Sequence, residues 1–364
     1  MLHILHLGQW DIATSPIGQE LLRLGVPHRF LGSPVSLRYR SKAELFLRIY
    51  PVLAWVTLRA AVQSLAFSRP PPTAVLVSSD IEALLFGLVR RVLRRRTLIV
   101  LQTLIITPRA SPFGNALYMR YWALILGLID LGLCHSRVEP ERYARQFPRQ
   151  GRKFAYVPYG VSTAYVIEPS PSRGTGVPMI VSAGRSGRDY PTLARAIDGL
   201  PCRLRIICDI PGPLERVAAS PQIDVLTKCF DREYLQALSD AAFVVVPLAV
   251  DDISAGQMVL LQAAGLGRAS VITGTATTAD YATDGEDALL VPRGDAAAMQ
   301  AAIRRLLDDP GLADRLGAAA LARFGRDHSK EAYVRNVVRA IQAAGHYQLI
   351  PGGVDAVRSM DKTL

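Results

Sequence analysis

The feature that most constrains the fold is an alternation of short apolar runs with helical patterns in the second half of the chain. The runs at 178–184, 202–208, 241–248 and 269–273 are apolar almost throughout, and helical patterns separate them at 188–200, 232–240, 255–267 and, further on, 296–307. Strands that are apolar on both faces are typical of a parallel sheet covered by helices on both sides. The second half is therefore predicted to be a doubly wound α/β domain.

The first half repeats this pattern less regularly. Its predicted strands lie at 2–8, 73–80, 97–103, 131–136 and 153–160. A Pro-, Gly- and Ser-rich segment at 168–178 predicts a linker. The predicted organisation is a Rossmann-like domain over 1–165, a second over 166–340, and a tail over 341–364. Two such domains would face each other across a central cleft, and ligands bind beyond the carboxyl ends of parallel strands.

The charge of the chain is distributed unevenly between the halves. Residues 1–150 hold 19 Lys and Arg against 8 Asp and Glu, which is the whole excess of +11. A one-sided basic surface attracts phosphate-rich partners such as anionic lipid or acidic substrates. The alternative is a solvated, arginine-rich face without a partner.

Two apolar segments of the first half bear on membrane contact. Residues 41–68 include Arg48 and Arg59, and residues 115–134 include Arg120, so neither segment is long and uncharged enough for a spanning helix. They are interpreted either as helices that dip into a membrane surface or as core helices. The chain starts without a secretory leader pattern, so a cytoplasmic location is expected, including the inner face of the membrane.

Cysteine, histidine and glycine patterns exclude several classes of protein. The four cysteines form no CxxC pair and the six histidines are scattered, so no metal site is expected. No GxGxxG follows the first strand, which argues against a dinucleotide-dependent dehydrogenase.

Two segments in the second half are suited to binding an anion. Ser254, Ala255, Gly256 and Gln257 precede an apolar helix directly after a buried strand. The first N–H groups of a helix are unsatisfied and lie at its positive end, and small residues let a phosphate approach them. The alternative is an ordinary helix cap with Ser254 as its N-cap.

The second anion-binding segment follows the strand at 178–184. Gly184 is followed by Arg185 and, three residues later, by Arg188 in a tight loop. Two guanidiniums at that sheet edge can bind a diphosphate through paired hydrogen bonds and stabilise it as a leaving group. The alternative is a pair of ordinary surface arginines.

Three stretches together resemble the retaining glycosyltransferases of family 4, also called glycosyltransferase group 1. They are KFAYVPYGVS (153–162), SAGRSGRDYPTLARAI (182–197) and the region from Val245 to Leu307, which ends in the family's tail pattern as DGEDALLVPRGD. The resemblance covers about 157–325 well and 1–150 only in outline. It implies the two-domain GT-B fold and a nucleoside-diphosphate sugar held mainly by the second domain.

The resemblance also assigns roles to residues of the predicted donor site. It implies that Arg185 and Arg188 bind the donor diphosphate, with Arg188 in place of the usual lysine. The family carries two glutamates eight positions apart, and here Ser254 and Gln262 stand at those positions. Gln262 would accept hydrogen bonds from the nucleotide ribose; the alternative is a satisfied buried amide. Ser254 is much shorter than the glutamate that contacts the donor sugar.

The first half departs from the family more strongly. Gly8 lacks a second glycine beside it, and Gln102 and Thr103 stand where the family often has a histidine. His6 and His135 are candidates for a catalytic histidine only by exclusion. The loop with Gln9, Trp10 and Asp11 is expected on the acceptor side.

The sequence as a whole predicts an enzyme, a retaining hexosyltransferase. A donor phosphate oxygen would act as base, and no cofactor or metal is expected. The expected partners are a nucleotide sugar, an acceptor sugar or glycolipid such as a lipid-linked or polysaccharide precursor, and the surface of an anionic membrane; nucleic acid is not expected. Two alternatives are a non-catalytic GT-B-like binding or scaffold protein and a sugar-nucleotide epimerase, which would need carboxylates in its cleft.

Overall fold

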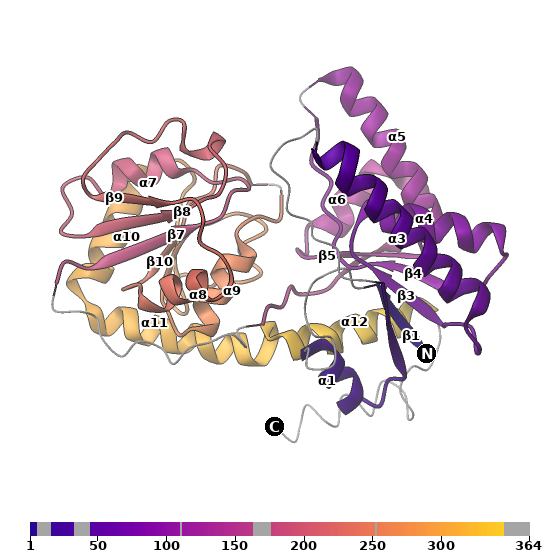
Figure 1. Cartoon of the computed structure of the whole chain (residues 1–364). Helices are drawn as coiled ribbons and strands as arrows, with labels where there is room; N and C mark the ends of the chain where they lie inside the picture. The colour runs from indigo at the N-terminus through magenta and orange to yellow at the C-terminus, as the bar shows by residue number, and fades with distance from the viewer. Residues whose placement is uncertain (6–15, 33–43, 110, 163–175, 252, 346–364) are drawn as a thin grey trace. The chain divides into compact units, whose positions relative to one another are not determined.

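A computed structural model describes residues 1–5, 16–32, 44–109, 111–162, 176–251 and 253–345 (Figure 1). The chain divides into two compact units. Unit 1 comprises Met1–Val157 and Val334–Leu364, and unit 2 comprises Pro158–Tyr333. The final helix, α12 (Lys330–Gly345), therefore starts in unit 2 and continues into unit 1. Most of the predicted linker at 168–178 lies outside the described residues, which resume at 176.

Unit 1 is built on a six-stranded parallel sheet with strand order β2-β1-β3-β4-β5-β6. The strands are β1 (Leu2–Leu5), β2 (His28–Leu31), β3 (Ala74–Val77), β4 (Leu98–Leu101), β5 (Leu131–Cys134) and β6 (Phe154–Tyr156). β1 is central, with Leu2 opposite His28 on one side and Ala74 on the other. Five of these strands lie within the predicted runs, and β2 is an addition.

The helices of unit 1 cover both faces of this sheet. They are α1 (Pro16–Arg23), η1 (Leu45–Ile49), α3 (Tyr50–Val62), η2 (Gln63–Phe67), α4 (Asp80–Val92), α5 (Pro112–Leu128), α6 (Glu139–Gln146) and η3 (Pro148–Lys153). Side chains of α3, α4, α5 and α6 join one hydrophobic cluster with Val75, Val77, Ile99 and Leu101 of the sheet. α1 lies beside α12, where Arg335 Nη1 donates to Glu20 Oε1 at 3.2 Å.

One helical stretch of unit 1 bears on membrane contact. Among the described residues, Phe46–Phe67 alone is long and apolar enough to cross a membrane by length and composition, and 39% of its most apolar window is buried within the protein. A core helix of a soluble protein satisfies the same criterion.

Unit 2 contains a second six-stranded parallel sheet, with strand order β12-β11-β10-β7-β8-β9. Its strands are β7 (Met179–Ala183), β8 (Arg203–Ile207), β9 (Ile223–Leu226), β10 (Val244–Val246), β11 (Ser270–Thr273) and β12 (Leu289–Val291). Its helices are α7 (Tyr190–Ala196), η4 (Gly212–Leu214), α8 (Asp231–Asp240), α9 (Gln257–Gly265), α10 (Ala296–Asp308), α11 (Pro310–Arg323) and η5 (Phe324–His328).

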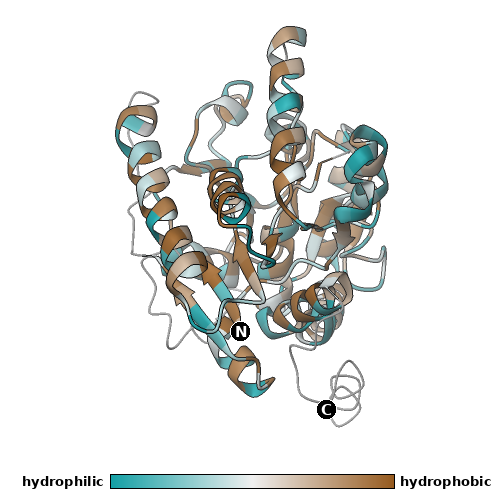
Figure 2. Cartoon of the chain, turned by 90° about the vertical axis from the view of Figure 1, so that its right-hand side faces the viewer, coloured by the Kyte–Doolittle hydropathy of each residue, from teal (hydrophilic) through white to brown (hydrophobic). Residues whose placement is uncertain are grey.

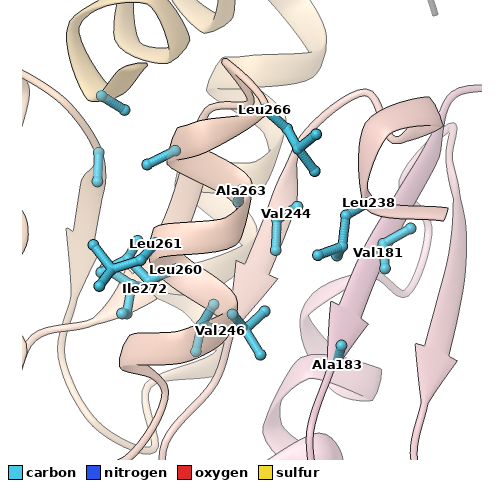
Figure 3. Close-up of a cluster of buried hydrophobic side chains, with 14 of the residues drawn as sticks. Val181, Ala183, Leu238, Val244, Val246, Leu260, Leu261, Ala263, Leu266 and Ile272 are labelled. Atoms are coloured by element: carbon cyan, nitrogen blue, oxygen red, sulfur yellow. The ribbon is translucent and has the colours of Figure 1, made fainter. Parts of the chain in front are cut away.

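The central strands of unit 2, β10 and β11, are buried on both faces, which is why their sequences are almost continuously apolar. Val244 and Val246 pack with α8 and α9 in one cluster, while Val245 between them packs with α7 and α10 in another (Figure 3 shows the first cluster). The predicted α/β class with two doubly wound parallel sheets is confirmed.

Candidate functional site

The loop after β7 is shaped by two glycines and one buried arginine. Gly184 has φ +106°, and a Cβ there would lie 2.4 Å from Arg188 Nη2, so glycine leaves room for the guanidinium. Arg188 Nε donates to the Ala183 carbonyl at 2.8 Å and its Nη1 to the Ser186 carbonyl at 2.9 Å. Only 9% of Arg188 is exposed, and this burial lowers the pKa of its guanidinium. Because arginine keeps its proton in proteins, the loop encloses a fixed positive charge.

Arg185 differs from Arg188 in its surroundings. Its side chain is 59% exposed, and Nη1 lies 3.1 Å from Asp209 Oδ2. Asp209 follows β8, the strand beside β7. An exposed ion pair of this kind is weak, so Arg185 can leave Asp209 for a more highly charged anion.

The second predicted segment forms the start of α9, with one correction. The helix begins at Gln257 and its N-cap is Gly256, with φ +86°, so the alternative in which Ser254 is the N-cap is wrong. No side chain caps this helix. Ser254 Oγ and Gln257 Nε2 are enclosed, and neither has a hydrogen-bond partner in the described part of the chain. Buried polar groups without a partner are costly and call for an explanation.

The structure brings the two predicted segments together at the carboxyl ends of β7 and β10. A Cβ at Gly187 would lie 2.7 Å from Val250 Cγ2 and 3.5 Å from Ala255 Cβ. The Ala249 N–H donates to the Gly187 carbonyl at 2.9 Å. The arginine loop therefore lies against the chain that leads into α9.

Gln262 lies one and a half turns further along α9 and contacts α8. Its Oε1 accepts a hydrogen bond from the Tyr234 hydroxyl at 2.9 Å. Burial raises the pKa of Tyr234, which keeps its hydroxyl protonated as the donor. The second lone pair of Oε1 and the Nε2 group are not used in that bond. Contact of Gln262 with a ribose stays a prediction.

The candidates in unit 1 are less informative. Gln9, Trp10, Asp11 and His6 lie outside the described residues. His135 is buried, with Nδ1 at 3.0 Å from the Val157 carbonyl and Nε2 at 3.2 Å from Thr103 Oγ1. These contacts favour a structural role for His135.

Residues that the sequence did not single out also lie at this edge of unit 2. Besides Asp209 and Tyr234, Arg293 follows β12, and its Nη1 donates to the Ala249 carbonyl at 3.1 Å. Arg293 Nε also lies 3.1 Å from Asp251 Oδ2. A signal exists for Asp209 and Arg293, because polar residues that directly follow parallel strands gather at one sheet edge. Across the described part of the chain, no three His, Cys, Asp or Glu residues come together as metal ligands.

Comparison with known proteins bears on both the fold and this site. Residues 188–309 match the family model described as "Glycosyl transferases group 1", a span that contains both α9 and Arg188. No sequence among curated proteins matches the chain significantly.

Solved structures match over almost the whole chain. Sucrose-phosphate synthase from Thermosynechococcus elongatus has a TM-score of 0.67 at 17% identity, covering 94% of this chain and 98% of that one. Trehalose 6-phosphate synthase from Burkholderia multivorans has a TM-score of 0.66 at 14% identity, covering 99% and 98%. Anabaena HepE in complex with UDP and glucose has a TM-score of 0.63 at 10% identity, covering 94% and 99%.

The fold is GT-B. The match of residues 188–309 to that family model, within a GT-B chain, supports glycosyltransferase activity, in agreement with the predicted enzyme class.

Proposed function

We propose that the chain is a retaining glycosyltransferase that moves a sugar from a nucleoside-diphosphate sugar to an acceptor hydroxyl. The observation that carries the proposal is the contact between the arginine loop and the segment leading into α9. The contact supports the proposal because it brings the loop that carries Arg185 and Arg188 against the chain that leads into α9, and both segments are suited to binding phosphate. HepE, a GT-B neighbour, is solved with UDP and glucose, so UDP-glucose is the first donor to test.

The proposed reaction breaks the bond between the donor sugar C1 and the diphosphate oxygen. The acceptor oxygen forms its bond to C1 on the same face, and the acceptor proton passes to a phosphate oxygen of the leaving diphosphate. Arg185, Arg188 and the first N–H groups of α9 would stabilise the charge that develops on that diphosphate. With these groups carrying the charge, the proposal requires no metal ion.

The enclosed donors at the start of α9 fit this proposal. Ser254 Oγ and Gln257 Nε2 would find hydrogen-bond partners in the phosphates or the sugar of a bound donor. Ser254 and Gln262 are uncharged where the resembling family has glutamates, so donor binding here would rely more on neutral hydrogen bonds. As acceptor we propose a lipid-linked sugar or polysaccharide precursor at the cytoplasmic side of a membrane.

The proposal is tested by measuring donor binding and turnover of the purified chain. Calorimetry with UDP, GDP and ADP identifies the base, and release of the nucleoside diphosphate from the matching sugar donor detects hydrolysis or transfer. The proposal expects binding and slow release without an acceptor, and a product that keeps the donor's anomeric configuration by NMR. Binding without hydrolysis or transfer to any acceptor would instead favour a non-catalytic binding protein.

A further inference from the structure

The outward face of α3 in unit 1 is apolar, although solvent-facing helix surfaces are normally polar. Exposed positions recur at Arg48, in η1 just before this helix, and along α3 at Val52, Trp55, Arg59 and Val62, which is the spacing of a single helix face. Trp55 at its centre is 68% exposed. In the preceding turn, Leu47 is 80% exposed.

The outward face of α5 has the same character. Its exposed positions include Phe113, Leu117, Arg120, Leu124 and Gly127, again along one face of the helix. Phe113 is 81% exposed and Leu117 62%. Isolated exposed apolar side chains are normal, but two helices with the same apolar stripe form a patch that calls for a partner.

The two stripes lie on the same side of unit 1. α4 packs against both α3 and α5. The inner sides of all three helices, with Ala60, Phe86 and Ile125 among them, belong to one core cluster with the sheet. Their outer sides therefore point away from the same sheet face, where Figure 2 shows helices with long hydrophobic segments. We call this surface the α3–α5 face; its main apolar residues are Leu47, Val52, Trp55, Phe113, Leu117 and Leu124.

The charges around the α3–α5 face are positive. Residues 44–130 contain ten arginines and four acidic residues. Each acid is engaged within the unit: Glu44 pairs with Arg48, Asp80 accepts from the Tyr121 hydroxyl, Glu82 caps α4 and Asp130 pairs with Arg90. The surface excess is therefore cationic and includes Arg59, Arg91, Arg94, Arg96 and Arg120, all exposed.

We infer that the α3–α5 face lies on an anionic lipid bilayer. Trp55, Leu47 and Phe113 would enter the headgroup region, where aromatic and aliphatic side chains are favoured, and the arginines would bind lipid phosphates. The helix Phe46–Phe67 would lie on the membrane rather than cross it, because its inner side packs into the core of unit 1. A second copy of this chain is a poorer occupant, since a two-fold contact would bring arginine-rich faces together.

This inference goes beyond the proposed glycosyl transfer and does not depend on it. All its residues are in unit 1, whereas the candidate donor site is in unit 2. Loss of vesicle binding and loss of nucleotide binding can therefore be observed separately.

The test is flotation of the full chain with vesicles of phosphatidylcholine, alone or with about 30% phosphatidylglycerol. We expect flotation with the anionic vesicles, and weaker flotation in about 0.5 M salt because salt screens the arginines. The double variant Leu47→Ser/Trp55→Ser should bind at least about tenfold more weakly, since it removes two inserted side chains. The matched control is Leu321→Ser, which removes a 45% exposed leucine from α11 of unit 2.

Circular dichroism and thermal unfolding confirm that each variant is folded, and light scattering without vesicles reports self-association. If the variant fails to fold, Arg91→Glu/Arg94→Glu replaces it, because charge reversal should also weaken binding to anionic vesicles. No flotation of the wild type, equal flotation of the variants, or resistance of the bound protein to a carbonate wash would overturn the inference. So would a dimer without vesicles that Leu47→Ser/Trp55→Ser disrupts, since a second copy would then cover this face.

Discussion

At the scale of single residues, Arg185 and Arg188 carry the same charge but are held differently. Arg185 is exposed and pairs with the surface residue Asp209, so Arg185→Ala should leave folding intact. It should weaken nucleoside-diphosphate binding by roughly 1.5–3 kcal/mol, the scale of a charge-assisted hydrogen bond. Calorimetry with the bound nucleotide measures this loss.

The matched control for Arg185→Ala is Arg304→Ala, which removes an exposed arginine from α10 without touching the candidate site. Unchanged affinity in Arg185→Ala, or an equal loss in the control, would remove Arg185 from the diphosphate site. Arg188 is less suitable for this test because it also donates hydrogen bonds to the Ala183 and Ser186 carbonyls, so its removal would change the loop itself.

Gln262 permits a substitution that should keep or strengthen donor binding, in contrast with Arg185→Ala. Gln262→Glu keeps the length of the side chain and its acceptor for Tyr234, and adds a charged acceptor for ribose hydroxyls. We expect donor affinity to be kept or to rise by up to about tenfold, since hydrogen bonds to charged groups are stronger. Calorimetry measures the donor affinity of the variant, and thermal unfolding measures its stability.

Gln262→Leu provides the comparison for Gln262→Glu, because it removes both the bond from Tyr234 and any bond to ribose. A variant Gln262→Glu that loses stability as strongly as Gln262→Leu, with no change in donor affinity, would show that Gln262 is only a structural amide.

At the scale of elements, the start of α9 depends on Gly256. Its φ of +86° disfavours other residues, and a Cβ would lie 3.0 Å from Val246 Cγ1. Gly256→Ala should therefore destabilise the chain by about 1–3 kcal/mol. It should also weaken donor binding, because the first N–H groups of α9 would shift. Thermal unfolding and nucleotide titration test the two effects.

Gly212→Ala serves as the control for Gly256→Ala, since Gly212 has open space around its Cα and an ordinary φ. It should be neutral or slightly stabilising through the unfolded state. Equal behaviour of the two variants would contradict the role assigned to Gly256.

The elements of unit 2 were largely predictable because its central strands are buried on both faces. Continuous runs such as 241–248 have no plausible exposed alternative, and β7, β8, β10 and β11 each lie inside a predicted run. β2 and β9 were missed because they are edge strands that are only partly buried. Their sequences, HRFL and IDVL, each include a charged residue and so are not continuous apolar runs. The predicted helical pattern started at residue 255, two residues before α9 begins, because Ser254 is a good N-cap by type, whereas the backbone turns at Gly256.

The segments that form the candidate site could be predicted from the sequence, but the residues that pair with Arg185 and Gln262 could not. The glycines and arginines of 184–188 and the small residues of 254–257 follow strands that are neighbours in the sheet. The pairing of Arg185 with Asp209, and of Gln262 with Tyr234, joins elements that are far apart in sequence. No spacing rule connects such residues, so they emerge only once the strand order is known.

At the scale of the whole molecule, stability should depend on pH through buried histidines. His3 in β1 is fully buried, with Nδ1 at 2.8 Å from Ser64 Oγ. Burial, followed by Arg29 and the amino terminus, lowers the pKa of His3 from 6.5 to about 4. Burial also lowers the pKa of His328 in unit 2. The folded chain therefore holds these rings neutral, while the unfolded chain protonates them near pH 6.5.

A depressed histidine pKa means that the unfolded state binds more protons between the two pKa values. Stability is thus fully present above about pH 6.5 and falls as the pH drops toward 4. For His3 the loss near pH 4 is about 2–3 kcal/mol, since one pKa unit corresponds to about 1.4 kcal/mol. Denaturant unfolding of the wild type and of His3→Gln across this range should give a steeper pH dependence for the wild type. Parallel curves would mean that the pKa of His3 is the same in the folded and unfolded protein.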